Sequence, residues 1–322
     1  MQYRTIGHSG PRISVVGFGG WGIGGATAGA TSYGSTDDAV SRRALRRAFE
    51  LGITFFDTSP AYGDGHSEAL IGETLHDVRE RVFLATKIGI RSFADGRADF
   101  TLASVRRSVE ESLARLRTDR IDLLQFHNAT AADLAANRDT LDHLERLRER
   151  GTIRLLGLSL KRPEDYAAAA ALVRADVVQV NLNMLDTRAV EAGLLPPRDP
   201  GLVPVIARTP LCFGFLSGHV DGGTVFSDAD HRSRWSPAQR RRWTDCARAA
   251  MDLVGPPGSH VWSQSALRFC LSFPGVATVI PGIMTEAEAD ANAAAAALGP
   301  LPADAAEAIL AFNRINSAFV GP

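Results

Sequence analysis

Short runs of β-branched and aromatic residues alternate with longer stretches in which apolar residues recur every three or four positions. This alternation predicts parallel strands that are joined by helical crossovers. The predicted strands run from Val15 to Phe18, Ile53 to Phe56, Val82 to Ala85, Ile121 to Phe126, Ile153 to Leu158, Val177 to Val180, Val203 to Ala207 and Val276 to Ile280.

The amphipathic stretches between these strands predict helices at about 37–51, 66–77, 101–117, 137–150, 163–172, 186–194, 259–273 and 285–298. Because each strand is followed by a helix, we expect an α/β fold of the closed (β/α)8 TIM-barrel type rather than an open sheet. A β-hairpin around Ser9 and Gly10 is expected to cap the bottom of the barrel. An extra C-terminal helix near 302–318 is expected to pack outside it.

Two segments fall outside this regular series. The segment from about 213 to 258 is rich in glycine and contains no clear strand, so it predicts an enlarged loop with a helix at 237–253. The segment from about 26 to 36 is a second extended loop. Long loops in compact folds usually act as lids or binding loops, and we expect that role here.

Composition and charge narrow the class of protein. The chain has 322 residues and a formal net charge of −1, which gives no reason to expect a nucleic-acid partner. We expect one barrel domain over residues 1–322. The chain start has no leader-like pattern and no apolar run approaches the roughly 20 residues of a membrane span, so we expect a cytoplasmic protein. The three cysteines lack CxxC spacing, and neither disulfides nor a metal site is expected.

Four titratable residues follow three consecutive predicted strands. They are Asp57, Tyr62, Lys87 and His127. In a (β/α)8 barrel, residues at strand ends meet at one rim, where the chemistry takes place. Lys87 is informative because Lys and Arg total 35 and lysine stands only at positions 87 and 161. A compact ammonium that burial can tune must be lysine, whereas a simple surface charge in this chain is usually arginine.

These residue types suit proton transfer to a carbonyl oxygen. A phenol with a pKa of about 10 is a weak acid unless a neighbouring cation adjusts it. Lys87 supplies that cation, Asp57 can hold the lysine, and His127 can orient the substrate oxygen. Proton donation of this kind needs a hydride source, and we expect NADP(H) or NAD(H). Each residue alone has a plain structural alternative, such as a turn aspartate or a packed aromatic.

The chain resembles the aldo-keto reductase family over nearly its whole length. The resemblance rests on segments in the family's order: GFGGWGIGG, GITFFDTSPAYGDGHSE, FLATK, DLLQFH, GLS, VQVNLN, RTPLCFGFLSG and VIPGI. It implies a catalytic tetrad of Asp57, Tyr62, Lys87 and His127, with NAD(P)H extended over the C-terminal rim of the barrel.

The resemblance also implies cofactor contacts. Gly20 and Trp21 would border the nicotinamide ribose, with Asp57 also among the cofactor-binding residues, and Ser159 and Gln179 would bind the carboxamide. The pyrophosphate would be wrapped by Thr209, Pro210, Leu211, Gly214 and Ser217. The adenosine half would be held by Pro281, Gly282, Thr285, Glu288 and Asn292. For the substrate pocket, the candidates are Trp21, Tyr33, Phe93, Asn128, Phe213 and Trp235, with Phe215 and Phe319 as further aromatic residues.

Three positions depart from the family pattern. Leu160 stands where the family usually has an asparagine, and Leu182 stands where it commonly has an aromatic ring over the nicotinamide. Met284 stands where many members carry Arg or Lys for the 2′-phosphate of NADPH. Without that clamp we expect a relaxed preference between NADPH and NADH.

The leading hypothesis is an oxidoreductase that reduces an aldehyde or ketone, or oxidises an alcohol or sugar, with Tyr62 as general acid/base. The form DTSPAYG resembles the branch that includes sugar dehydrogenases, so the direction stays open. One alternative is a cofactor-binding regulatory or redox-sensing subunit with little turnover. Another is a barrel lyase or isomerase that forms a Schiff base at Lys87.

Overall fold

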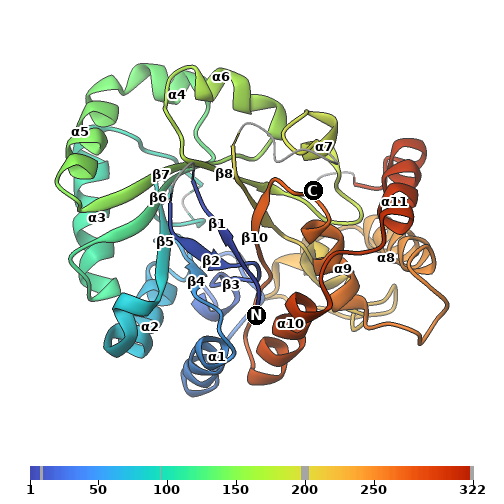
Figure 1. Ribbon diagram of the computed structural model, residues 1–322. Coiled ribbons are helices and arrows are strands. Elements are labelled where there is room, and N and C mark those ends of the chain that lie inside the picture. The colour runs from blue at the N-terminus through green and yellow to red at the C-terminus, as the bar shows by residue number, and fades with distance from the viewer. Residues whose placement is uncertain (8–9, 95, 197–202, 320–322) are drawn as a thin grey trace.

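The computed structural model describes residues 1–7, 10–94, 96–196 and 203–319. Eight parallel strands form one sheet in the order β10-β9-β8-β7-β6-β5-β4-β3. Figure 1 shows these strands at the centre of the molecule with helices around them. The strands are β3 (Phe18–Gly19), β4 (Phe55–Asp57), β5 (Phe83–Ile88), β6 (Ile121–His127), β7 (Ile153–Ser159), β8 (Val177–Asn181), β9 (Val205–Arg208) and β10 (Val276–Ile280).

The sheet closes on itself between its first and last strands. Parallel bridges join Val16 to Val279 and Gly19 to Gly282. The (β/α)8 barrel predicted from the sequence is therefore confirmed. The first predicted strand, Val15 to Phe18, is displaced, because residues 15–17 bond toward β10 and only Phe18–Gly19 pairs with β4.

The helices surround the barrel in chain order, and α1 packs against both α2 and α10. Those that follow strands are α1 (Asp38–Glu50), α2 (His66–Leu75), α3 (Leu102–Leu116), α4 (Ala131–Ala136), α5 (Arg138–Glu149), α6 (Tyr166–Ala170), α7 (Arg188–Glu191), α9 (Trp262–Leu271) and α10 (Glu286–Leu298). The helix predicted at 237–253 is α8 (Pro237–Asp252), and the final helix is α11 (Ala303–Asn316). Short 3₁₀ turns lie at Gly22–Gly24, His76–Arg81, Pro163–Asp165, Cys212–Gly214 and His231–Arg234.

Two predicted helices are shorter than the pattern suggested. The stretch 163–172 opens with a 3₁₀ turn at Pro163–Asp165, and α6 covers only Tyr166–Ala170. The stretch 186–194 contains only α7, because the Asn183 side chain accepts the N–H groups of Leu185 and Asp186 and forms a turn instead. Side-chain bonds of this kind compete with helical backbone bonds.

Side chains that point into the barrel change character from bottom to top. The lower layer is apolar and contains Phe55, Phe83, Leu123, Val177 and Ile206. Alternate residues further along the strands are polar, which follows from the two-residue repeat of a β-strand. The bottom of the barrel is therefore an apolar core, while its top carries polar side chains.

The bottom is closed by the predicted hairpin, whose strands are β1 (Tyr3–Thr5) and β2 (Arg12–Ser14). Ile6 and Ile13 pack onto the lower apolar layer. In Figure 1 the dark-blue hairpin lies across the near end of the barrel. The turn expected at Ser9 lies outside the described residues.

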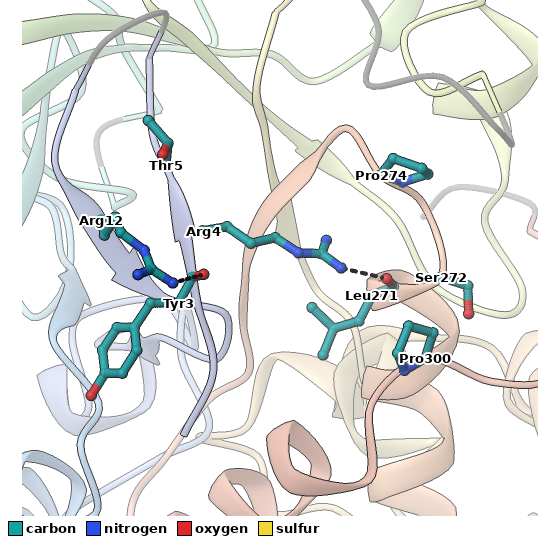
Figure 2. Close-up of a pocket in the computed structure, with 8 residues that line it drawn as sticks. All are labelled: Tyr3, Arg4, Thr5, Arg12, Leu271, Ser272, Pro274 and Pro300. Atoms are coloured by element: carbon teal, nitrogen blue, oxygen red, sulfur yellow. Dashed lines mark hydrogen bonds between the residues drawn. The ribbon is translucent and has the colours of Figure 1, made fainter.

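Arg4 fastens this hairpin to the rest of the barrel beside a surface hollow of about 590 Å³. Its guanidinium donates to the carbonyl oxygens of Leu271, Phe273 and Val276, at the end of α9 and the start of β10. Figure 2 shows Arg4 reaching across this hollow to Leu271. Leu271 is the last residue of α9, where a helix leaves its carbonyl oxygens without intrahelical partners, so Arg4 caps this helix.

No single helix among the described residues has the length and apolar composition to span a bilayer. The consecutive helices α10 and α11 are long and apolar enough only together, and they meet at a bend of 114°.

Candidate active site

The polar groups at the top of the barrel come from the last residues of successive strands. Asp57 ends β4, Lys87 lies one residue before the end of β5, and His127 ends β6. Each points inward because it continues the alternation that places Phe55, Phe83 and Leu123 in the apolar layer below. All three are at most 2% exposed.

Lys87 and Asp57 form a buried ion pair. The Lys87 Nζ donates to Asp57 Oδ1 at 2.5 Å and to the Thr58 carbonyl oxygen at 2.8 Å. Burial alone lowers the pKa of Lys87, but the charges and hydrogen bonds of Asp57 and Tyr62 outweigh it and leave that pKa above its ordinary value. Lys87 is therefore a fixed cation.

Tyr62 is positioned by a loop that packs tightly on its neighbour. Gly63 has φ +66°, and a Cβ there would lie 2.0 Å from the carbonyl oxygen of Gly24, so the chain requires glycine. The Lys87 Nζ lies 4.8 Å from the centroid of the Tyr62 ring. Burial raises the pKa of Tyr62, and the Lys87 ammonium opposes that rise without cancelling it. Tyr62 is thus a neutral phenol beside a cation.

His127 completes the group of four. Its ring stands edge-to-face to Tyr62, with centroids 6.2 Å apart, and Phe93 packs at 5.6 Å. Its Nδ1 lies 3.3 Å from the Ser59 hydroxyl. Burial, with the charges of Lys87 and Arg208, holds the pKa of His127 well below its usual range, so the imidazole is neutral.

A chain of amides runs beneath these groups. Asp57 Oδ2 accepts from Gln125 Nε2 at 3.0 Å and from Gln179 Nε2 at 2.9 Å. The Ser159 hydroxyl in turn donates to Gln179 Oε1 at 3.3 Å. Both oxygens of Asp57 are therefore engaged, which fixes its carboxylate. Gln125 was not among the sequence candidates, although its inward position two residues before His127 marks it.

Three of the four residues, Asp57, Tyr62 and His127, line a cavity of about 500 Å³, here called the inner cavity, and Lys87 reaches it through its bond to Asp57. It is lined by Gly19, Gly20, Trp21, Gly22, Tyr33, Asp57, Tyr62, Phe93, His127, Asn128, Lys161, Arg162, Gln179, Asn181, Arg188, Arg208, Thr209, Phe213, Ile280, Gly282 and Phe319.

An adjoining outer cavity of about 450 Å³ continues from it. Its lining includes Tyr33, Thr209, Pro210, Leu211, Phe213, Gly214, Ser217, His219, Val220, Arg232, Ser263, Gly282, Met284, Ala287, Glu288, Ala291 and Asn292. Four residues line both cavities: Tyr33, Thr209, Phe213 and Gly282. Together the two cavities form a continuous elongated site.

Most of the cofactor and substrate candidates line one cavity or the other. Ser159, Pro281 and Thr285 line neither: Ser159 reaches the site through Gln179, and Thr285 caps α10 by a reciprocal bond with Glu288. Among the substrate candidates, Trp235 also lies outside, packing behind Phe213 with ring centroids 5.0 Å apart.

The three residues that depart from the family pattern lie in different surroundings. Leu160 and Leu182 are buried in the apolar packing between the strands and the helices, so they do not line the cavities. Leu182 therefore does not take the place of that aromatic ring. The inward positions are taken by Asn181 and Arg208, and sequence reasoning missed both. Met284 does line the outer cavity.

The two extended loops predicted from the sequence meet above the site. Ser32 bridges Asp230, and the ring of Trp21 packs on both Tyr33 and His231 at about 5 Å. Arg232 holds the contact, since it pairs with Asp230 at 2.7 Å and lies over the Tyr33 ring. Residues of these loops line both cavities, since Tyr33 lines each of them and Arg232 lines the outer one.

Comparison with known proteins decides the family. The sequence model described as "Aldo/keto reductase family" matches residues 15–314. The chain belongs to the aldo/keto reductase family. Aldo/keto reductases are NAD(P)H-dependent carbonyl oxidoreductases, and the chain is an oxidoreductase of this kind.

Several individual aldo/keto reductases are similar to the chain. Aldo-keto reductase YhdN of Bacillus subtilis (strain 168) is 32% identical over 258 residues, which cover 79% of this chain and 75% of that protein. L-Galactose dehydrogenase of Arabidopsis thaliana is 29% identical over 304 residues, covering 92% and 88%.

Solved aldo/keto reductase structures share the fold. The holo form of AKR11C1 from Bacillus halodurans superposes with a TM-score of 0.77 at 28% identity, covering 97% of this chain and 96% of that one. Glycerol dehydrogenase AKR11B4 from Gluconobacter oxydans gives a TM-score of 0.78 at 26% identity, covering 99% and 97%.

The shape of the site fits a dinucleotide. The inner and outer cavities join end to end, and Gly282 at their junction has nothing within 4 Å of where a Cβ would stand. A flat ligand can therefore pass close to the backbone there.

Proposed function

We propose that the chain transfers a hydride between NAD(P)H and an aldehyde or ketone, or the reverse on an alcohol or sugar, with Tyr62 as general acid/base. The observation that carries this proposal is the neutral Tyr62 phenol beside the fixed Lys87 ammonium, at one end of an elongated site. A bound dihydronicotinamide supplies the hydride. The side chains of this protein carry out the proton transfer.

In the reductive direction Tyr62 donates its phenolic proton to the carbonyl oxygen. The resulting phenolate is stabilised by Lys87, which stays charged because Asp57 holds it at 2.5 Å. General acid catalysis of this kind contributes about 10²- to 10⁴-fold to the rate. In the oxidative direction the same phenolate accepts the proton of the alcohol.

His127 is proposed to orient the substrate oxygen. The Ser59 hydroxyl accepts the N–H of Ala61, which leaves its own proton for Nδ1 of His127. In the tautomer that we propose, Ser59 donates this proton to Nδ1, and Nε2 carries the N–H of the neutral imidazole. A neutral donor can bind the oxygen without competing with Tyr62 for the proton.

For the cofactor, the inner cavity offers Gly20, Trp21 and Gln179 to the nicotinamide half, with Ser159 behind Gln179. The outer cavity offers Pro210, Leu211, Gly214 and Ser217 to the pyrophosphate and Glu288 and Asn292 to the adenosine half. Thr285 and Pro281 would support the latter by shaping the start of α10.

A Schiff-base mechanism at Lys87 is disfavoured. Such chemistry needs a free amine, whereas Asp57 and the Thr58 carbonyl oxygen bind the Lys87 ammonium and its pKa is raised.

The test is turnover of a panel of aldehydes, ketones and sugars with NADPH and NADH, followed by absorbance of the reduced cofactor. We expect turnover of at least one carbonyl or alcohol class. Cofactor binding without turnover of any class would instead support the regulatory alternative.

A further inference from the structure

Arg208 places a cation in the inner cavity and bonds to neutral groups there. It is the last residue of β9, and it lines the cavity. Its Nε donates to Asn181 Oδ1 and its Nη2 to the Leu160 carbonyl oxygen, both at 2.9 Å, and Nη1 lies 3.5 Å from the Ser159 hydroxyl. In the part of the chain that the structure describes, no carboxylate pairs with this guanidinium.

The other charges around the inner cavity are either paired or exposed. The pairs are Lys87 with Asp57 at 2.5 Å, Arg188 with the buried Asp186 at 2.7 Å, and Arg162 with Asp165 at 2.6 Å. Lys161 and Arg162 are exposed, so water and salt screen their charges. Arg208 is partly buried, and among the described lining residues it therefore supplies the positive charge that is neither paired nor screened.

This guanidinium lies among the groups that surround the reacting atoms. Ser159, which Arg208 contacts, bonds at 3.3 Å to Gln179, and Gln179 lines the cavity. Burial, and after it the charges of Lys87 and Arg208, lower the pKa of His127, so the charge of Arg208 reaches the catalytic groups. Hydride transfer requires the donor and acceptor carbons to approach to about 3–3.5 Å. The nicotinamide ring must therefore bind in the cavity that Arg208 lines.

The two redox states of the nicotinamide ring differ by one positive charge. The ring is a neutral dihydropyridine in NAD(P)H and a cationic pyridinium in NAD(P)+. A guanidinium is always charged in a protein, and it interacts favourably with a neutral π-system. Two like charges in a site that excludes water repel each other, because a low dielectric constant strengthens their interaction. The charge of Arg208 therefore acts differently on the two forms of the cofactor.

We propose that Arg208 makes the site selective for the reduced cofactor, because its charge repels the cationic ring of NAD(P)+ and leaves the neutral ring of NAD(P)H in place. The inference rests on the proposed function, since it concerns the cofactor of the same site. It also gives that function a direction. The site fills with reduced cofactor when both forms are present, so the enzyme works as a carbonyl reductase, while the equilibrium constant of the reaction in solution is unchanged.

The experiment measures Kd for NADPH, NADP+, NADH and NAD+ by isothermal titration calorimetry, with no carbonyl substrate present. The informative quantity is the Kd of the oxidised form divided by the Kd of the reduced form within each pair. Contacts to the adenosine half and to the 2′-phosphate are common to both members of a pair, so they cancel in this ratio. We expect a ratio of at least about tenfold in the wild type, from the repulsion of two unit charges at short range.

Three variants test whether the ratio depends on the charge of Arg208. In Arg208→Gln, which removes the charge and keeps an amide donor, the ratio should fall by about tenfold through tighter binding of the oxidised form. In Arg208→Lys the charge remains, so the ratio should stay within about threefold of the wild type. The matched control Arg162→Gln removes an exposed cation of the same cavity that Asp165 already neutralises, and its ratio should stay within about twofold.

The outcomes separate this inference from the proposed function. A ratio near one in the wild type would contradict the inference. So would an Arg208→Gln protein in which both Kd values of a pair rise together, because Arg208 would then only support the shape of the site. The expected ratios without turnover of any carbonyl or alcohol would contradict the proposed function alone. Failure of all four nucleotides to bind would contradict both.

Discussion

A buried lysine beside a phenol sets the protonation states on which the proposed chemistry depends. Burial raises the pKa of Tyr62 despite the opposing Lys87 charge, and the pKa of His127 is lowered by burial and by neighbouring cations. At neutral pH both are therefore in their uncharged forms. Tyr62 is ready to donate a proton, and His127 cannot compete with it as an acid.

The pH dependence of turnover follows from these directions. Reduction needs the phenol, so its kcat should be flat from about pH 6 to 9 and fall only as pH rises through the raised pKa of Tyr62, above the ordinary value of about 10. Oxidation needs the phenolate, so its kcat should rise with pH. Steady-state kinetics in both directions measure this. A fall in reductive kcat centred between pH 6 and 7 would point to a titrating histidine and contradict the assignment.

A single side chain in the outer cavity bears on cofactor preference. Met284 lines that cavity, while Arg232 is held by both oxygens of Asp230. We expect the Kd values for NADPH and NADH to differ by less than about a hundredfold, near 2.7 kcal/mol. Met284→Arg should tighten NADPH by about tenfold and leave NADH unchanged, because only NADPH offers a 2′-phosphate.

Fluorescence titration with both reduced cofactors provides the check, and Met284→Leu is the size-matched control. A wild-type preference above about a hundredfold would mean that another residue binds the 2′-phosphate.

At the level of elements, strand alternation explains both the packed bottom and the polar top of the barrel. The same strands that contribute Phe55, Phe83 and Leu123 to the lower layer present Asp57, Lys87 and His127 above it. Stability and chemistry are thereby divided between the two ends. Changes at the bottom should alter stability without altering turnover.

Arg4 offers a direct test of this division. Arg4→Met removes the donor to three carbonyl oxygens at the α9–β10 corner, so the free energy of unfolding should fall by about 2 kcal/mol. The control Arg12→Met removes one exposed bond to the Tyr3 carbonyl oxygen and should change it by less than about 0.5 kcal/mol. Urea unfolding measures both. Equal losses, or a reduced kcat of folded Arg4→Met, would contradict the role assigned to the hairpin.

At the scale of the whole molecule, periodicity predicted the barrel because each strand and helix leaves a local pattern of apolar residues. It placed Asp57, Lys87 and His127 at one rim for the same reason. The closure of the barrel was harder to predict in detail. The first strand pairs with β4 on one side and forms isolated bridges to the β10 segment on the other, and no local sequence pattern predicts these bridges.

The cavity lining was predicted less completely. Gln125 and Arg208 occupy inward positions that strict alternation could have identified. The position of Ser159 behind Gln179, outside the cavity lining, depends instead on hydrogen bonds that no local pattern predicts. Trp235 shows the converse, because an aromatic residue in a predicted lid packs behind the cavity instead of lining it.

Tyr62→Phe tests the central claim most directly, because it removes the phenolic proton and keeps the ring. The measurement is kcat for carbonyl reduction together with the Kd of the reduced cofactor for the same preparation. We predict that kcat falls by about a thousandfold while Kd stays within about twofold, since only the proton step is lost. A Tyr62→Phe enzyme with the kcat of the wild type would contradict the account.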